Sequence, residues 1–418
     1  MYKNFGLGEY IEKILMEKIV LISQYYYPDS AATGYLMTDL AEGLVKRGMD
    51  VVVYTGYPSY WGVKKDCNHS EYYNGVKIQR LFHFRTDTRT KLGSILHGLS
   101  FFSVALLKSL LKPEKRTFVI VTTPPFLPIL GWIVHKIRKI RYVIIIHDID
   151  PDISIKVGFI KKGFLTNLWD NVNVHVMENA EQMVVLGECM ALLIQQKIPN
   201  YTDKINIIQN WTDENYIKPQ PKTGNFFAKD NGLVNSFVIL YSGNMGVNHN
   251  LEVIIDAAKR LESDSFSFVF IGEGVKKKQL VEKAEQLGLN NVRFFDYQPY
   301  ELLPFSMTCS DVIIISQDKG LDGLCVSSKF YSALAAGRPI LALVGPTTEI
   351  ARVVHSSSCG FVISDYDPEK IANRIIELKD HPELRKKMGE NARKILETEF
   401  SKESAIDKYY ELIKDIKD

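Results

Sequence analysis

Residues 312–344 read VIIISQDKGLDGLCVSSKFYSALAAGRPILALV, and this stretch decides the fold class. Two nearly continuous apolar runs, at residues 312–316 and 339–344, flank a polar loop and a helical stretch of small residues. Apolar strands that alternate with helices are typical of a parallel sheet covered on both faces. The stretch therefore predicts an α/β architecture.

The same alternation extends along the chain in both directions. We expect strands at residues 19–23, 51–55, 76–82, 118–122, 142–147, 182–186 and 205–208, and again at 237–242, 268–271, 292–295, 312–316, 339–344 and 361–363. Asn250 is expected to cap the helix that follows residues 237–242. Residues 211–236 break the alternation with Pro219, Pro221, Gly224 and Gly232, which is typical of a linker.

The pattern predicts two doubly wound, parallel-sheet, Rossmann-like domains. The first comprises residues 1–215 and the second residues 237–400, with a linker at 216–236 and a last helix at 401–418. Doubly wound domains bind ligands at the carboxyl ends of their strands. If the two domains face each other, the cleft between them is the expected site.

Composition narrows the class of partner. The 418 residues include 51 Lys and Arg against 49 Asp and Glu, and a net charge of +2 gives no reason to expect a nucleic acid. The five cysteines have no CxxC spacing, and the start of the chain lacks the features of a signal peptide. We therefore expect reduced thiols and a cytoplasmic protein.

Three loops at strand ends have the small residues that allow a ligand to approach the backbone. The first follows residues 19–23 and ends at Thr33 and Gly34, where a helix begins. The other two are Tyr241-Ser-Gly-Asn-Met-Gly246 and Ile271-Gly-Glu-Gly274. Backbone N–H groups at such turns suit a phosphate, although each turn alone is equally explained by a plain strand-to-helix connection.

The loop at residues 320–339 carries the sharpest signal. Ser327, Ser328 and Lys329 stand where the helix of small residues begins. Hydroxyls, backbone N–H groups and one lysine there suit a diphosphate. The alternative is a solvated helix cap with a surface lysine.

Several motifs in this order resemble family 4 of the retaining glycosyltransferases with the GT-B fold. They are Tyr26-Tyr-Pro28 with Gly34, Thr122-Thr-Pro-Pro125, His147-Asp-Ile-Asp-Pro-Asp152, Val184-Val-Leu186, Asn210-Trp211, Tyr241-Ser-Gly-Asn244, Gly272-Glu-Gly274 and residues 323–339. The resemblance runs from Lys18 through nearly the whole chain. The sequence is similar in particular to the bacterial O-antigen and capsule branch of this family, which includes N-acetyl-fucosamine transferases.

The resemblance implies that the first domain holds the acceptor and the second a nucleotide sugar, with UDP favoured. Its last helix is expected to cross back to the first domain. The implied donor-binding residues are Thr33, Gly34, Gly243, Asn244, Gly272, Glu273, Gly274, Asp322, Gly323, Ser327, Ser328 and Ser332. Tyr27 and Asp152 are the acceptor-binding candidates, and His147, Asp148 and Lys329 the catalytic candidates.

Two departures from the family pattern affect these roles. The family carries two glutamates separated by seven residues, but the equivalent positions here are approximately Leu324 and Ser332, so Asp322 is the candidate for the first role. The family's Arg and Lys in the loop after the second domain's first strand are also missing from residues 244–249. Lys329 is the candidate replacement.

The expected chemistry is metal-independent transfer with retention and without a further cofactor. Leaving-group charge is then stabilised by backbone N–H groups and Lys329. His147 at a strand end is interpreted as a ligand of sugar or phosphate, with a buried core histidine as the alternative. Asp148 and Asp152 are candidates for binding or deprotonating the acceptor, although the departing phosphate can itself take that proton.

Residues 91–112 are expected to form an amphipathic helix with an unusually apolar face. Leu92, Ile95, Leu96 and Leu99 recur at helical spacing, and Lys91, Lys108 and Lys112 flank them. With nearby Lys156, Lys161 and Lys162, the helix suggests peripheral contact with the inner face of the cytoplasmic membrane and a polyprenyl-diphosphate-linked glycan acceptor. Packing against the sheet is the alternative.

Three other functions share parts of this pattern. A nucleotide-sugar epimerase has the same two-domain architecture. A nicotinamide dehydrogenase requires a GxGxxG motif after the first strand, which residues 30–34 do not supply. An inactive sugar-binding homologue stays open because the two glutamates are missing.

Overall fold

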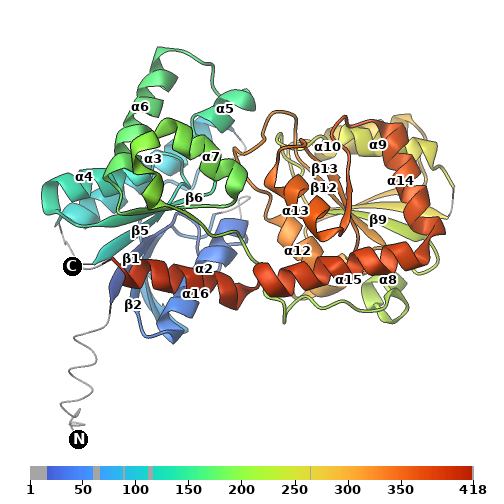
Figure 1. Ribbon diagram of the computed structural model, residues 1–418, viewed down its shortest axis with the longest axis horizontal. Coiled ribbons are helices and arrows are strands. Elements are labelled where there is room, and N and C mark those ends of the chain that lie inside the picture. The colour runs from blue at the N-terminus through green and yellow to red at the C-terminus, as the bar shows by residue number, and fades with distance from the viewer. Residues whose placement is uncertain (1–16, 60–65, 88–89, 112–115, 264, 417–418) are drawn as a thin grey trace, which may run out of the picture.

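The computed structural model describes residues 17–59, 66–87, 90–111, 116–263 and 265–416. Two α/β lobes lie side by side (Figure 1). The first contains an eight-stranded sheet of order β3-β4-β2-β1-β5-β6-β7-β8, and the second a six-stranded sheet of order β11-β10-β9-β12-β13-β14. The prediction of two doubly wound parallel sheets is confirmed.

The first sheet is parallel except at one edge. Its strands are β1 (Lys18–Ile22), β2 (Asp50–Thr55), β3 (Ser70–Tyr73), β4 (Val76–Arg80), β5 (Thr117–Val121), β6 (Tyr142–Ile146), β7 (Gln182–Val185) and β8 (Ile205–Ile207). At the centre, Val20 of β1 is in register with Val52 of β2 and Phe118 of β5. β3 was not predicted from the sequence, because this antiparallel edge strand is short and half exposed.

Helices cover both faces of the first sheet. They are α2 (Ala32–Lys46), α3 (Lys91–Leu111), α4 (Pro128–Arg138), α5 (Asp152–Lys156), α6 (Phe164–Asn179) and α7 (Glu188–Lys197), with the 3-10 helix η2 (Pro199–Lys204). Alternate strand residues face opposite ways. Val20 and Ile22 pack with α3, α4, α6 and α7, whereas Ile19 and Leu21 pack with α2.

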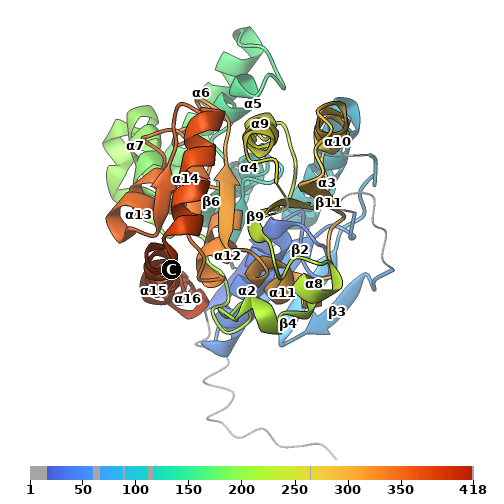
Figure 2. The same cartoon turned by 90° about the vertical axis from the view of Figure 1, so that its right-hand side faces the viewer.

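The second lobe repeats this layering. Its strands are β9 (Phe237–Ser242), β10 (Phe266–Ile271), β11 (Val292–Phe295), β12 (Val312–Ser316), β13 (Ile340–Leu343) and β14 (Gly360–Val362). Its helices are η3 (Lys222–Gly224), α8 (Phe226–Asp230), α9 (Glu252–Arg260), α10 (Lys277–Gln286), η4 (Tyr300–Leu302), α11 (Leu303–Thr308), α12 (Lys329–Ala335), α13 (Glu349–Ser357), α14 (Pro368–Asp380) and α15 (Pro382–Glu399). Helices α9, α10 and α14 lie on one side of the sheet, and α8, α12 and α15 on the other (Figure 2).

Two local predictions in this lobe were wrong. Asn250 does not cap α9, which begins at Glu252 after Leu251 and has no side-chain cap. Residues 211–236 are not only a connection, because they contain η3 and α8. Phe227 and Leu233 from this stretch are buried in the core of the second lobe, so its proline and glycine content concealed an anchored segment.

The last helix, α16 (Lys402–Lys414), returns to the first lobe and lies beside α2 (Figure 1). Ile406 and Tyr409 of α16 belong to the same buried cluster as Leu40 of α2. Gly43 makes this close packing possible, because a β-carbon there would lie 2.5 Å from Cδ1 of Ile406. The end of the chain therefore completes the core of the first domain.

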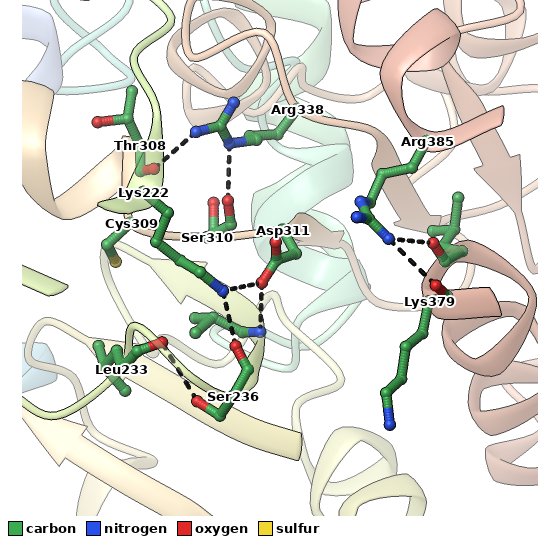
Figure 3. Close-up of polar contacts among 12 residues, drawn as sticks. Lys222, Leu233, Ser236, Thr308, Cys309, Ser310, Asp311, Arg338, Lys379 and Arg385 are labelled. Carbon is green, nitrogen blue, oxygen red and sulfur yellow. Dashed lines mark hydrogen bonds and ion pairs between the residues drawn. The ribbon is translucent and has the colours of Figure 1, made fainter. Parts of the chain in front are cut away.

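A basic cavity of about 550 Å³ lies at the amino ends of the second sheet's strands. Three of its cations, Lys222, Arg338 and Arg385, are bound to the protein itself (Figure 3). Lys222 donates to Asp311 and to the carbonyl of Ser236, and Arg338 donates to the carbonyls of Ser310 and Thr308. Arg385 likewise donates to the carbonyl of Leu378. The Lys222–Asp311 contact fastens the linker to the amino end of β12, opposite the cleft, and the Arg385 contact joins α15 to the end of α14.

Candidate functional site

Two neighbouring cavities lie where the carboxyl ends of the two sheets face each other. The larger, about 370 Å³, is the aromatic cavity, lined among others by Tyr35, Trp211, Tyr216, Tyr297 and Tyr300. The smaller, about 210 Å³, is the polar cavity, lined among others by His147, Asp148, Asn210, His249, Gln317 and Ser327. The cavities share Ala32, Leu36, Ser328 and Lys329. A ligand that spans both must pass Lys329.

Three stacked tyrosines from different parts of the chain form one wall of the aromatic cavity. The ring of Tyr300 lies 4.8 Å from that of Tyr35 on α2 and 4.5 Å from that of Tyr216, with interplanar angles of 16° and 7°. Because the rings already stack on one another, they present their edges and outer faces to a further planar ring. The wall joins the first lobe, the linker and the second lobe.

Hydroxyl and carboxylate groups complete the aromatic cavity. Ser332, which the resemblance makes the approximate equivalent of the family's second glutamate, has its hydroxyl 3.3 Å from that of Thr212. Asp39 and Asp213 also line the cavity. The cavity thus contains carboxylates that could accept hydrogen bonds from sugar hydroxyls, even though the glutamate is absent.

Lys329 is held in a narrow channel at the junction of the two cavities. A β-carbon on Gly243 would lie 2.3 Å from the Cε of Lys329, so the glycine is required for the lysine stem to pass. The Lys329 Nζ lies 3.0 Å from Nε2 of His249. Burial lowers the pKa of Lys329 to about 8, which leaves most of these side chains charged at pH 7.

His147 and Asp148 follow β6 and line the polar cavity. The backbone N–H of His147 donates to the Thr122 hydroxyl over 3.0 Å. Burial lowers the pKa of His147 to about 4, so its imidazole is neutral at pH 7. Burial, with the neighbouring charge of Asp150, raises the pKa of Asp148 to about 7, which is suited to exchanging a proton.

The His147–Asp148 loop contacts the donor-side loop directly. The Ile149 N–H donates to the Leu324 carbonyl over 2.9 Å, and Asp148 forms a β-bridge with Cys325. The position that holds the family's first glutamate therefore contacts the first lobe with its backbone. Gly323 allows this approach, since its φ is +73° and a β-carbon would lie 2.9 Å from Leu193.

The two glycine turns of the second lobe pack on each other. A β-carbon on Gly272 would lie 2.2 Å from the carbonyl oxygen of Gly243, and one on Gly274 would lie 2.3 Å from that of Met245. The Glu273 carboxylate pairs with Lys277 at 2.6 Å. Loop packing alone therefore explains these glycines, although Gly243 also lines the aromatic cavity.

Some of the remaining candidates line the polar cavity, whereas others are bonded within the protein. Thr33, Ser327 and Ser328 line the polar cavity, and Gly34 lies beside them in the first turn of α2. Asp322 is instead hydrogen-bonded to Thr347 at 2.7 Å. The backbone carbonyl of Asn244 accepts a hydrogen bond from the Tyr241 hydroxyl.

The two acceptor candidates also have protein partners. Tyr27 stacks on Tyr73 with ring centroids 3.9 Å apart. Asp152 forms an ion pair with Lys197 at 2.8 Å. Neither belongs to the described lining of the aromatic or the polar cavity.

Several cavity residues were missed in the sequence. Tyr35, Tyr216, Tyr297 and Tyr300 come from separate segments and meet only in the folded chain. His249 ends the loop at residues 244–249, where the family resemblance leads one to expect an arginine and a lysine. The presence of this basic residue in that loop was the feature of the sequence that could have indicated its place in the cavity.

A separate surface feature lies on α3. Among the described residues, α3 is the one helix with the length and mean hydropathy to cross a membrane, and 28% of its most apolar window is buried. Its small residues Gly93, Gly98 and Ala105 face the protein. The large side chain of Phe101 is buried with them, whereas six other large apolar side chains are exposed, namely Leu92, Ile95, Leu96, Leu99, Leu107 and Leu111. Lys112 lies outside the described residues.

Comparison with known protein families covers both lobes. The Glycosyl transferase 4-like domain matches residues 33–211, and Glycosyl transferases group 1 matches residues 225–395. The chain is 26% identical to the probable glycosyltransferase WbjE of Pseudomonas aeruginosa over 94% of this chain and 97% of WbjE. It is 25% identical to WcaI of Escherichia coli K12, named for colanic acid biosynthesis, over 80% of this chain and 85% of WcaI.

Solved structures share the fold at lower identity. Sucrose-phosphate synthase of Thermosynechococcus elongatus superposes with a TM-score of 0.78 at 14% identity, covering 96% of this chain and 99% of that one. HepE of Anabaena, solved in complex with UDP-glucose, gives 0.72 at 15% identity, covering 96% and 100%. With both family domains matched in order and the GT-B architecture shared, the chain belongs to family 4 of the GT-B glycosyltransferases and is a glycosyltransferase.

Proposed function

We propose that the enzyme transfers a hexosyl residue from a UDP-sugar to a lipid-linked glycan in bacterial polysaccharide assembly, with retention and without a metal ion. The observation that carries the proposal is the meeting of the aromatic and polar cavities at Lys329. The order of aromatic cavity, Lys329 and polar cavity matches the order of parts in a nucleotide sugar, which are a planar base with its ribose, a diphosphate and a sugar. The polysaccharide pathway is supported by the likeness to WbjE and WcaI.

The aromatic cavity suits the nucleoside. The stack of Tyr35, Tyr300 and Tyr216 offers aromatic edges and outer faces to the base, and Asp39 and Asp213 offer acceptors for ribose hydroxyls. UDP is favoured because HepE, which has the same fold, was solved with UDP and with UDP-glucose. The diphosphate then lies next to Lys329, and the sugar in the polar cavity.

Lys329 supplies the charge that the reaction requires. As the bond between the anomeric carbon and the diphosphate oxygen breaks, negative charge grows on that oxygen, and a nearby ammonium stabilises it. The acceptor oxygen forms the new bond to the anomeric carbon, and its proton passes to the departing diphosphate. In this proposal neutral His147 hydrogen-bonds the sugar and Asp148 binds the acceptor or relays its proton, which is supported by their lining of the polar cavity and by their shifted pKa values. Retention itself is proposed from the family resemblance.

The exposed face of α3 supports a lipid-linked acceptor. Phe164 and Leu165, at the start of α6, are also exposed. The Lys91 ammonium donates to the carbonyl of Phe159 over 3.1 Å, so α3 contacts the loop that bears Lys161 and Lys162. Apolar side chains beside lysines are the pattern that binds an anionic bilayer. Contact there keeps the cleft close to acceptors embedded in the membrane.

Release of the nucleoside diphosphate tests the proposal. UDP-, GDP- and dTDP-sugars are each incubated with the enzyme and a polyprenyl-diphosphate-linked glycan, and free nucleoside diphosphate is measured. We expect release from a UDP-sugar that depends on the acceptor and is not reduced by EDTA. An epimerised sugar without acceptor-dependent release would instead support the epimerase, which the family assignment does not favour. The absence of nucleoside diphosphate release with every donor would contradict the proposal.

A further inference from the structure

His249 holds a fixed protonation state at the bottom of the polar cavity. Its Nδ1 lies 2.6 Å from the carbonyl oxygen of Ser316, at the end of β12. A carbonyl can only accept a hydrogen bond, so Nδ1 carries the proton. Burial and then the charge of Lys329 lower the pKa of His249, which keeps the ring neutral. Nε2 is therefore an acceptor with its lone pair toward Lys329.

Lys329 is constrained at both ends by its surroundings. Its stem crosses Gly243, and its Nζ donates to Nε2 of His249 over 3.0 Å. The Nζ also lies 5.7 Å from the centroid of the buried Tyr241 ring. An ammonium has three protons, and the bond to His249 uses one. The side chain lines both cavities, so its other protons are available toward a ligand between them.

We infer that His249 is a positioning residue, which accepts from Lys329 through Nε2 and thereby aims the ammonium at the donor diphosphate. This inference rests on the proposed donor site. A lysine has four rotatable bonds, and fixing its head before the ligand arrives lowers the entropy lost on binding. The alternative is that His249 only satisfies the Ser316 carbonyl and stabilises the loop at residues 244–249.

Two substitutions separate these roles. The amide nitrogen of an asparagine takes the approximate place of Nδ1, so His249→Asn keeps a donor for Ser316 and loses the acceptor for Lys329. The amide of a glutamine reaches the approximate place of Nε2, so His249→Gln keeps the acceptor for Lys329 and loses the donor for Ser316. The groups facing this pair are otherwise the Tyr241 phenol, the Cys325 thiol and the Lys276 ammonium.

Calorimetric titration with UDP tests the inference in wild type, H249N, H249Q, K329M and H249N/K329M, with the thermal midpoint of each variant recorded. We expect H249N to weaken UDP binding about five- to tenfold, H249Q to bind within about twofold of wild type, and H249N to add nothing in the K329M background. Equal losses from H249N with and without Lys329 would overturn the inference, as would unchanged binding by H249N. If H249N does not fold, the test rests on H249Q. The inference is overturned if folded H249Q binds UDP as weakly as K329M does.

Failure of the proposed donor site gives a different result. In that case wild-type enzyme does not bind UDP or another nucleoside diphosphate, or K329M binds as tightly as wild type. If K329M is weakened and H249N is not, only the role of His249 is wrong.

Discussion

Asp39 on α2 and Lys402 at the start of α16 form an ion pair of 2.5 Å beside the aromatic cavity. The other carboxylate oxygen of Asp39 accepts from the indole of Trp211 at 3.3 Å. Burial raises the pKa of Asp39, and the charge of Lys402 opposes this shift. The last helix therefore contributes both to the core of the first lobe and to the charge balance of the cleft.

Replacing Lys402 by methionine should destabilise the fold, because a mostly buried carboxylate loses its counter-charge. Both side chains are partly exposed, at 18% and 28%, so we expect a loss of about 1–2 kcal/mol in the free energy of unfolding. Urea denaturation measures it. Part of the loss should be recovered in D39N/K402M. Lys414, in an exposed pair with Glu411, is the matched control, and a K402M loss no larger than that of K414M would contradict the prediction.

UDP binding should weaken as pH rises, because burial lowers the pKa of Lys329 to about 8. A diphosphate binds the protonated lysine better, so donor binding retains the proton and raises this pKa by linkage. From pH 7 to pH 9 the dissociation constant for UDP should rise about tenfold, since only about a tenth of the lysines stay charged one unit above their pKa. Calorimetry at pH 7, 8 and 9 measures this change. K329M should bind weakly with no such rise, and a flat wild-type profile would be inconsistent with a role for Lys329.

Substitution of Gly272 should disrupt the paired glycine turns. Its φ is +137°, and a β-carbon would lie 2.2 Å from the carbonyl oxygen of Gly243. G272A should lower the free energy of unfolding by about 2–4 kcal/mol and weaken UDP binding. Gly288, with φ of +68° and open space around it, is the control, and G288A should cost about 1 kcal/mol without affecting UDP. Equal effects would mean that backbone conformation alone matters.

Charges on the exposed face of α3 should reduce membrane binding. L96E/L99E places two carboxylates among residues that are 43% and 44% exposed, so stability should change little. Co-sedimentation with phosphatidylglycerol vesicles should fall at least fivefold, because apolar contact is lost and like charge is added. L192E on α7, at a site 58% exposed, is the control and should sediment as wild type. Unaffected sedimentation of L96E/L99E would exclude this face as the contact.

The sequence predicts the two sheets well because their central strands are apolar throughout. The runs at residues 142–147 and 312–316 correspond to β6 and β12, each buried on both faces. The edge strand β3 was missed, since its polar residues carry no such signal. The burial of Phe227 in the second core depends on contacts made after folding, which local composition does not reveal.

The sequence allowed the loops that form the site to be predicted, but not which side chains contact one another within it. Ser327, Ser328 and Lys329 were recognised because hydroxyls and a lysine at a helix start have a chemical meaning. The role proposed for His249 depends on a carbonyl 67 residues away in the chain, at Ser316. Asp322 was predicted to replace a missing glutamate; its carboxylate accepts a hydrogen bond from Thr347, and its role in donor binding stays a prediction.

A crystal structure with UDP bound tests the central claim most directly. We expect the uracil against the wall of Tyr35, Tyr300 and Tyr216, and a diphosphate oxygen within hydrogen-bonding distance of the Lys329 Nζ. UDP bound elsewhere, for example in the basic cavity beside Arg338, with the cleft unoccupied at saturating UDP, would contradict the account.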